Sequence, residues 1–184
     1  MARKILTWGV VAGVVLFFWG FVSHTLLPIG EAGFRILPED AALLEFMGKQ
    51  APEPGIYFYP RLDPKAGPEH MEEWQKRAAS GPSGLIVHRP RGGTGMTPRL
   101  LGNELLSNIA CGIIAAWLLA QLPPMTFGRR AGCVTILGVL AWLAVDFSQW
   151  NWYGFPTPYT MGAFVDETVG FALMGLVLAW AFRD

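Results

Sequence analysis

Four long apolar segments constrain the fold of this chain more than any other feature. Residues 5–22 contain no charged side chain, and residues 105–122, 131–145 and 162–182 form three further apolar stretches. A helix of about 20 apolar residues crosses the roughly 30 Å of hydrocarbon in a bilayer. In lipid a helix satisfies its backbone hydrogen bonds internally, whereas an isolated strand does not. We therefore predict a mainly α membrane protein with four transmembrane helices.

Basic residues in the short flanks predict the orientation of these helices. They fall before the first segment, between the second and third, and after the fourth, at Arg3, Lys4, Arg129, Arg130 and Arg183. The positive-inside rule assigns such flanks to the cytoplasm, and long loops are exempt from it. Both termini are then inside and residues 28–99 outside. No cleavage site follows the first segment, which reads as an uncleaved anchor. We expect a multi-pass protein of a bacterial cytoplasmic (inner) membrane.

The pattern divides the chain into three parts. Residues 1–27 form the first transmembrane helix, residues 28–99 a small extracytoplasmic α/β lobe, and residues 100–184 a three-helix transmembrane region with an aromatic outer hairpin at 147–162. Within the lobe, helical patterns at 39–50 and 70–79 alternate with short strand patterns at 55–60 and 85–88.

The lobe has no clear means of folding by itself. A segment of this size without disulfides or metal is marginal as an independent core. We expect it to lean on the membrane helices or on a partner. Residues 23–99 contain nine basic and nine acidic side chains, and this balance argues against nucleic acid as a partner.

Carboxylates lie close to one end of three of the apolar segments. They are Glu104, Asp146, Asp166 and Glu167. If successive segments cross the bilayer in alternating directions, all four reach the outer face, where acids usually have a partner or a purpose. We expect Glu104, with Asn103 as the helix cap, and Asp166 and Glu167 to lie in the first turns of their helices. There the helix dipole favours an anion.

Asp146 has no such explanation. It lies near the expected C-terminal end of its helix, where the dipole opposes a negative charge, so it needs a donor or a proton. Candidate donors are His24, Arg99, Asn103 and Asn108. Glu104, Asn108 and Cys111 are spaced at i, i+4 and i+7, which predicts a polar stripe facing the bundle. The candidate polar or ion site therefore comprises Asp146, Asp166, Glu167, Glu104, Asn108 and His24.

Aromatic residues are concentrated in the outer hairpin, at Trp150, Trp152, Tyr153, Phe155 and Tyr159. An interfacial aromatic belt explains them and is the favoured interpretation. The alternative is a surface that docks a partner or covers the acidic face. Gly162, Gly170 and Gly175 in the last segment are expected to permit close helix approach.

Established catalytic and ligand motifs do not occur. The chain has no HxxxH or CxxC spacing, P-loop, dinucleotide fingerprint or nucleophile elbow, so we predict no metal site and no cofactor. The favoured hypothesis is a non-catalytic accessory or interaction subunit that binds a protein partner, or a second copy of itself, in the lipid bilayer. The alternative is a small proton- or cation-handling transporter or membrane enzyme that uses the outer-face carboxylates.

Overall fold

The computed structural model describes residues 1–61, 63, 65–91, 93 and 95–183. Contacts divide the chain into two compact units. The first combines Met1–Phe34 with Met96–Asp184, and the second is Arg35–Gly95. Residues 28–34 and 96–99, which the sequence pattern groups with the lobe, thus pack with the membrane helices.

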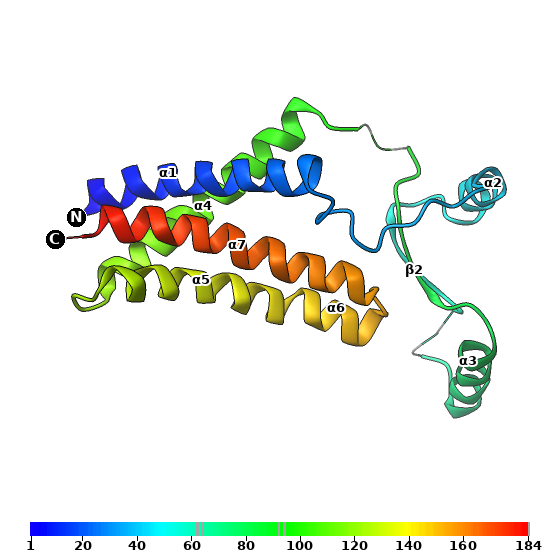
Figure 1. The fold of residues 1–184 in the computed structure, drawn as a ribbon. Helices are drawn as coiled ribbons and strands as arrows, with labels where there is room; N and C mark the ends of the chain where they lie inside the picture. Colours follow the sequence, from blue (N-terminus) through cyan, green and yellow to red (C-terminus); the bar gives the residue numbers. More distant parts are fainter. Residues whose placement is uncertain (62, 64, 92, 94, 184) are drawn as a thin grey trace. The chain divides into compact units, whose positions relative to one another are not determined.

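The first unit is a bundle of helices (Figure 1). Its elements are α1 (Ala2–Phe21), a π-helical turn η1 (Val22–Leu26), α4 (Pro98–Gln121), α5 (Phe127–Ala144), α6 (Asp146–Tyr153) and α7 (Thr157–Ala181). Ala2–Leu26, Pro98–Gln121, Phe127–Tyr153 and Thr157–Ala181 are long and apolar enough to span a membrane. The prediction of four such helices is confirmed.

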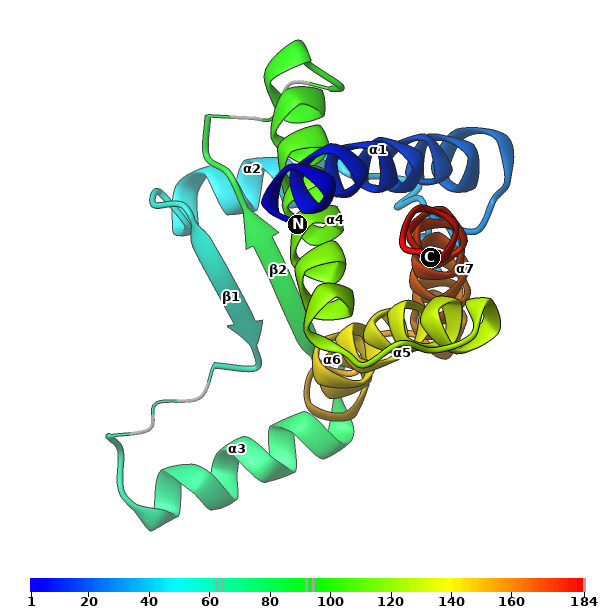
Figure 2. The ribbon, with the colours of Figure 1, turned by 90° about the vertical axis from the view of Figure 1, so that its left-hand side faces the viewer.

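Small residues set the order of packing in the bundle. Helix α1 packs against α4 and α7, and α7 packs against α5 (Figure 2). A Cβ atom added at Gly112 would lie 2.2 Å from the carbonyl oxygen of Gly9, so α1 and α4 touch backbone to backbone. Gly175 makes the same kind of close approach to the backbone of Ala131 in α5, whereas Gly170 makes room for the side chains of Leu16 and Trp19 of α1. The buried apolar core is formed by Ala12, Ala115, Ala116, Leu119, Val134, Met174 and Leu178.

The two ends of the bundle hold different parts of the chain. Both termini and the α4–α5 connection lie at one end, whereas η1 and the α6–α7 connection lie at the other (Figure 1). At this second end the chain leaves η1 through residues 27–34, which we call the strap. The strap packs on α7, since a Cβ at Gly162 would lie 2.8 Å from the carbonyl oxygen of Ile29.

The second unit contains α2 (Ala41–Gln50), β1 (Gly55–Tyr59), α3 (Pro68–Ser80) and β2 (Gly84–His88). The strands pair antiparallel, with Gly55 opposite His88 and Tyr59 opposite Gly84. The predicted order helix–strand–helix–strand is confirmed. Among the described residues of this unit only Met47 and Ala51 are buried.

Candidate functional site

A pocket of about 190 Å³ lies at the strap end of the bundle. We call it the carboxyl pocket, and it is lined by His24, Ile29, Gly30, Asp146, Tyr159, Gly162, Ala163, Asp166 and Glu167. Four of the six site residues predicted from the sequence therefore meet around one cavity. They come from η1, α6 and α7, which are distant from one another in the sequence.

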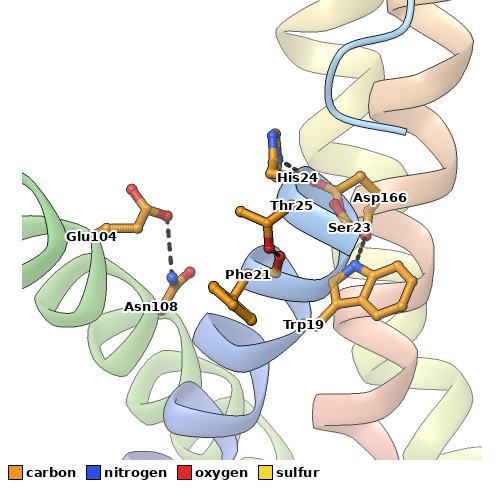
Figure 3. Close-up of polar contacts among 8 residues, drawn as sticks. All are labelled: Trp19, Phe21, Ser23, His24, Thr25, Glu104, Asn108 and Asp166. Carbon is orange, nitrogen blue, oxygen red and sulfur yellow. Dashed lines mark hydrogen bonds and ion pairs between the residues drawn. The ribbon is translucent and has the colours of Figure 1, made fainter. Parts of the chain in front are cut away.

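The other two predicted site residues lie elsewhere. Asn108 donates a hydrogen bond from Nδ2 to Oε1 of Glu104 over 3.1 Å, and both are on α4 (Figure 3). Glu104 is exposed, whereas Asn108 and Cys111 are half-buried, and Gly13 of α1 packs against the backbone oxygen of Asn108. Glu104 and Asn108 do not line the carboxyl pocket.

Asp166 is held by three side chains from the end of α1 and from η1 (Figure 3). Ser23 donates from Oγ to Oδ1 of Asp166 over 2.5 Å, and Nε2 of His24 lies 3.2 Å from Oδ2. The indole N–H of Trp19 donates to the backbone oxygen of Asp166 over 2.9 Å. Ser23 is completely buried. Asp166 therefore joins α1 to α7.

The π-helical turn explains how two consecutive residues reach one carboxylate. In an α-helix neighbouring side chains point about 100° apart. The wider i→i+5 turn of η1 changes this spacing, and Ser23 and His24 contact the two oxygens of Asp166. The sequence analysis included His24 but missed Ser23 and Trp19, since apolar periodicity carries no signal for a π-helical turn.

Asp146 is the first residue of α6 and is only 7% exposed. Helix α5 ends at Ala144, and Val145 interrupts the helix with φ −112° and ψ −67°. A new run of bonds then begins, with the amide of Gln149 donating to the carbonyl oxygen of Val145 over 2.9 Å. Asp146 therefore lies where α5 ends and α6 begins, so the C-terminal end of α5 opposes its negative charge and the N-terminal end of α6 favours it.

Asp166 and Glu167 are not in the first turn of their helix. Helix α7 begins at Thr157, earlier than the expected start near Gly162, so the two acids lie in its third turn. The favourable effect of a helix N-terminus is confined to about the first turn. The explanation of these two acids by the helix dipole is wrong.

The same correction applies to Glu104. Helix α4 begins at Pro98, and the amide of Leu100 donates to Oγ1 of its cap, Thr97, over 3.3 Å. Asn103 is thus inside the helix and is not its cap. Glu104 lies in the second turn, and its partner is Asn108.

Asp146 and Glu167 form a pair at the pocket wall. Both side chains line the carboxyl pocket, Asp146 from α6 and Glu167 from α7. Neighbouring carboxyl groups repel each other when both are ionised, and a proton shared between them removes the repulsion. Oε2 of Glu167 is buried and has no hydrogen-bond partner among the described residues. The carboxyl pocket therefore contains an acid pair with one acceptor oxygen to spare.

The proposed donors to Asp146 are engaged differently. His24 contacts Asp166, and Asn108 donates to Glu104. Arg99 and Asn103 are exposed on α4. Within the pocket, Asp146 shares the lining with a second acid, Glu167.

The aromatic hairpin is mostly helical, because α6 occupies residues 146–153 and only residues 154–156 connect it to α7. Gly154 closes α6 with a φ of +71°, a conformation that favours glycine. The indole N–H of Trp150 donates to Oγ1 of Thr157 over 3.1 Å. Tyr159 lines the pocket and packs against Phe155, while Trp152 is largely exposed.

Comparisons with protein-family models, with curated proteins and with solved structures find no match for this chain. Among the described residues, no group of three or more His, Cys, Asp or Glu side chains is arranged to hold a metal ion. A role is therefore argued from the chemistry of the carboxyl pocket.

Proposed function

We propose that this membrane protein handles protons or small cations at the carboxyl pocket, as a small transporter. The observation that carries the proposal is that Asp146 and Glu167 line one pocket, with Oε2 of Glu167 buried and lacking a hydrogen-bond partner within the described chain. Ionised carboxyl groups in a membrane are costly unless they are paired. A proton or a cation bound between these two groups removes that cost.

The two halves of the acid cluster suit different roles. Asp166 accepts hydrogen bonds from Trp19 and Ser23 and also contacts His24, which suits a structural anchor between α1 and α7. Asp146 and Glu167 line the pocket from two different helices, α6 and α7. The group that gains and loses a proton or cation is therefore assigned to this pair.

The orientation is part of the same proposal. The basic flanks lie near the termini and the α4–α5 connection, and these share the end of the bundle opposite the carboxyl pocket (Figure 1). The positive-inside rule favours the cytoplasm for that end. The carboxyl pocket and residues 35–95 then belong to the extracytoplasmic side of a bacterial cytoplasmic membrane.

Infrared titration of the protein in liposomes tests the proposal. The parent protein should show a carbonyl stretch of a protonated carboxyl group that disappears as the pH rises. Asp146→Asn and Glu167→Gln should each remove a component of this change that Glu104→Gln leaves in place, because an amide of the same shape cannot ionise. Glu104→Gln is the matched control, since Glu104 is an exposed acid outside the pocket.

Proton flux into the same liposomes, followed with an enclosed pH dye, tests the transport step. The parent and Glu104→Gln should show equal proton flux. Asp146→Asn and Glu167→Gln should show no flux above that of empty liposomes. An infrared titration or a flux that Asp146→Asn and Glu167→Gln leave unchanged would contradict the proposal.

A second candidate is an accessory subunit that binds a protein partner through residues 35–95. Ile56 and Val87 lie directly opposite each other in the sheet and are 62% and 66% exposed. Phe58 follows on the same face and is half-exposed. A face of this kind on so small a sheet favours a binding role.

Co-purification from the native membrane tests this candidate. A stoichiometric partner should accompany the parent protein and be lost from Ile56→Ser/Val87→Ser. Ile136→Ser is a control in the bundle, because Ile136 has similar exposure and belongs to the first unit. Recovery of the parent without a partner would argue against an accessory role.

A further inference from the structure

We propose that the strap, residues 27–34, is a lid that controls access to the carboxyl pocket. The inference rests on the proposed function only for the identity of what enters. It deepens that function by assigning a gate to the same site. The lid is argued from the contacts of the strap with η1 and α7.

The middle of the strap closes one wall of the pocket. Ile29 and Gly30 line the cavity together with His24 and Gly162. A Cβ atom at Gly30 would lie 1.9 Å from Nδ1 of His24, and one at Gly162 would lie 2.8 Å from the carbonyl oxygen of Ile29. The strap thus rests on η1 and on α7 with no room for a methyl group.

The end of the strap is seated on a second pocket residue, Tyr159. Gly33 has a φ of +88°, and a Cβ there would lie 2.9 Å from Cβ of Tyr159. The ring of Phe34 packs edge-on against the ring of Tyr159, with the centroids 5.8 Å apart. Movement of the strap therefore changes the surroundings of Tyr159 and of the cavity that it lines.

The strap is built as one piece attached to η1. The amides of Leu27 and Gly30 donate to the carbonyl oxygens of Val22 and Ser23. Within the strap, Ala32 donates to Ile29 over 3.2 Å and Phe34 to Glu31 over 3.1 Å. These bonds can persist when the strap lifts, whereas the glycine contacts with α7 are short-range packing that a small displacement removes.

Cysteine labelling tests the lid. Ala163→Cys, at the pocket wall, is placed in a protein whose own Cys111 and Cys133 are replaced by alanine. It is then labelled in liposomes with a small cationic methanethiosulfonate reagent. Gly33→Ala should raise the labelling rate about tenfold, which corresponds to about 1.4 kcal/mol of lost closure. The added methyl collides with Tyr159 and displaces the strap.

Gly154→Ala is the matched control. Gly154 also has a positive φ, of +71°, but a Cβ there meets nothing within 4 Å. Its labelling rate should equal that of the parent. Equal rates in the parent, Gly33→Ala and Gly154→Ala would overturn the lid.

The two proposals fail separately. Labelling controlled by Gly33 together with a titration that Glu167→Gln does not affect would keep the lid and reject proton or cation handling. If Glu167→Gln alters the titration but Gly33→Ala does not change the labelling rate, proton or cation handling is kept and the lid is rejected.

Discussion

Two acids adjacent in the sequence take different partners in this protein. Asp166 faces α1 and η1, where it meets Ser23 and His24, whereas Glu167 lines the carboxyl pocket with Asp146 of α6. Consecutive helical residues point about 100° apart, so one turn of α7 serves two neighbouring elements. This division separates the anchoring of the bundle from the acid pair of the carboxyl pocket.

The anchoring role of Asp166 leads to a first prediction. Ser23→Ala should lower the free energy of unfolding by about 1–2 kcal/mol, because the buried Ser23 hydroxyl is the donor to Oδ1 of the half-buried Asp166. His24→Ala should cost less than about 1 kcal/mol, since the His24 side chain is 55% exposed. Reversible unfolding in mixed micelles measures both values. An equal cost for the two variants would show that burial does not set the strength of these contacts.

Sequence reasoning located the acids but not their neighbours. Asp146, Asp166, Glu167 and His24 line one pocket, as the alternating direction of the segments implies. The contribution of Ser23 depends on η1, and a π-helical turn leaves no mark in the apolar pattern. The apolar pattern therefore does not predict contacts between residues that an irregular turn brings together.

At the scale of elements, the helices were predicted better than their ends. Apolar length identified the membrane helices, yet α4 and α7 begin several residues earlier than their apolar runs. A signal was present, because Thr97-Pro98 and Thr157-Pro158 place proline in the first turn, where helices favour it. If the start of α7 is taken from Pro158, Asp166 no longer lies in the first turn of that helix. The helix dipole then does not explain why an acid occurs at this position.

The crossing of α1 and α4 gives a second prediction. Gly112→Ala should destabilise the bundle by about 1–3 kcal/mol, because its methyl group would overlap the backbone of α1. Gly102→Ala, on the same helix, is the control. A Cβ there meets nothing within 4 Å, and alanine favours a helix by up to about 1 kcal/mol. Unfolding measurements that rank Gly112→Ala as the more stable variant would contradict the packing described here.

The contact of α5 with α7 gives a third prediction. The indole N–H of Trp142 donates to the backbone oxygen of Thr160 over 2.8 Å, and its ring packs against Phe147 and Phe164. Trp142→Phe should therefore cost about 1 kcal/mol of stability, the worth of one hydrogen bond. Trp152→Phe should change stability by less than about 0.5 kcal/mol, because Trp152 is largely exposed. Thermal unfolding in detergent compares the two, and equal shifts would argue against the hydrogen bond.

At the scale of the whole molecule, the two units differ in what holds them together. The bundle has a continuous buried core and backbone contacts at glycines. The second unit has a two-stranded sheet, and its described part buries only Met47 and Ala51. The sequence predicted this contrast, since residues 35–95 alternate short patterns with Gly and Pro breaks, and such segments bury too little surface to fold alone.

The weak core of the second unit gives the last prediction. A fragment of residues 35–95 should show no cooperative thermal transition by circular dichroism, because a single two-stranded sheet is at best marginally stable in water. Its amide protons should exchange rapidly.

In the full chain the two ends of this segment, Arg35 and Gly95, are joined to residues of the first unit. Because the ends are already held, pairing β1 with β2 costs less loop-closure entropy than in the free fragment. Slower amide exchange of β1 and β2 in the full chain than in the fragment would support stabilisation by the bundle or by a partner. A cooperative transition of the isolated fragment would instead identify residues 35–95 as an independent domain, and its exposed face at Ile56 and Val87 would then require another explanation.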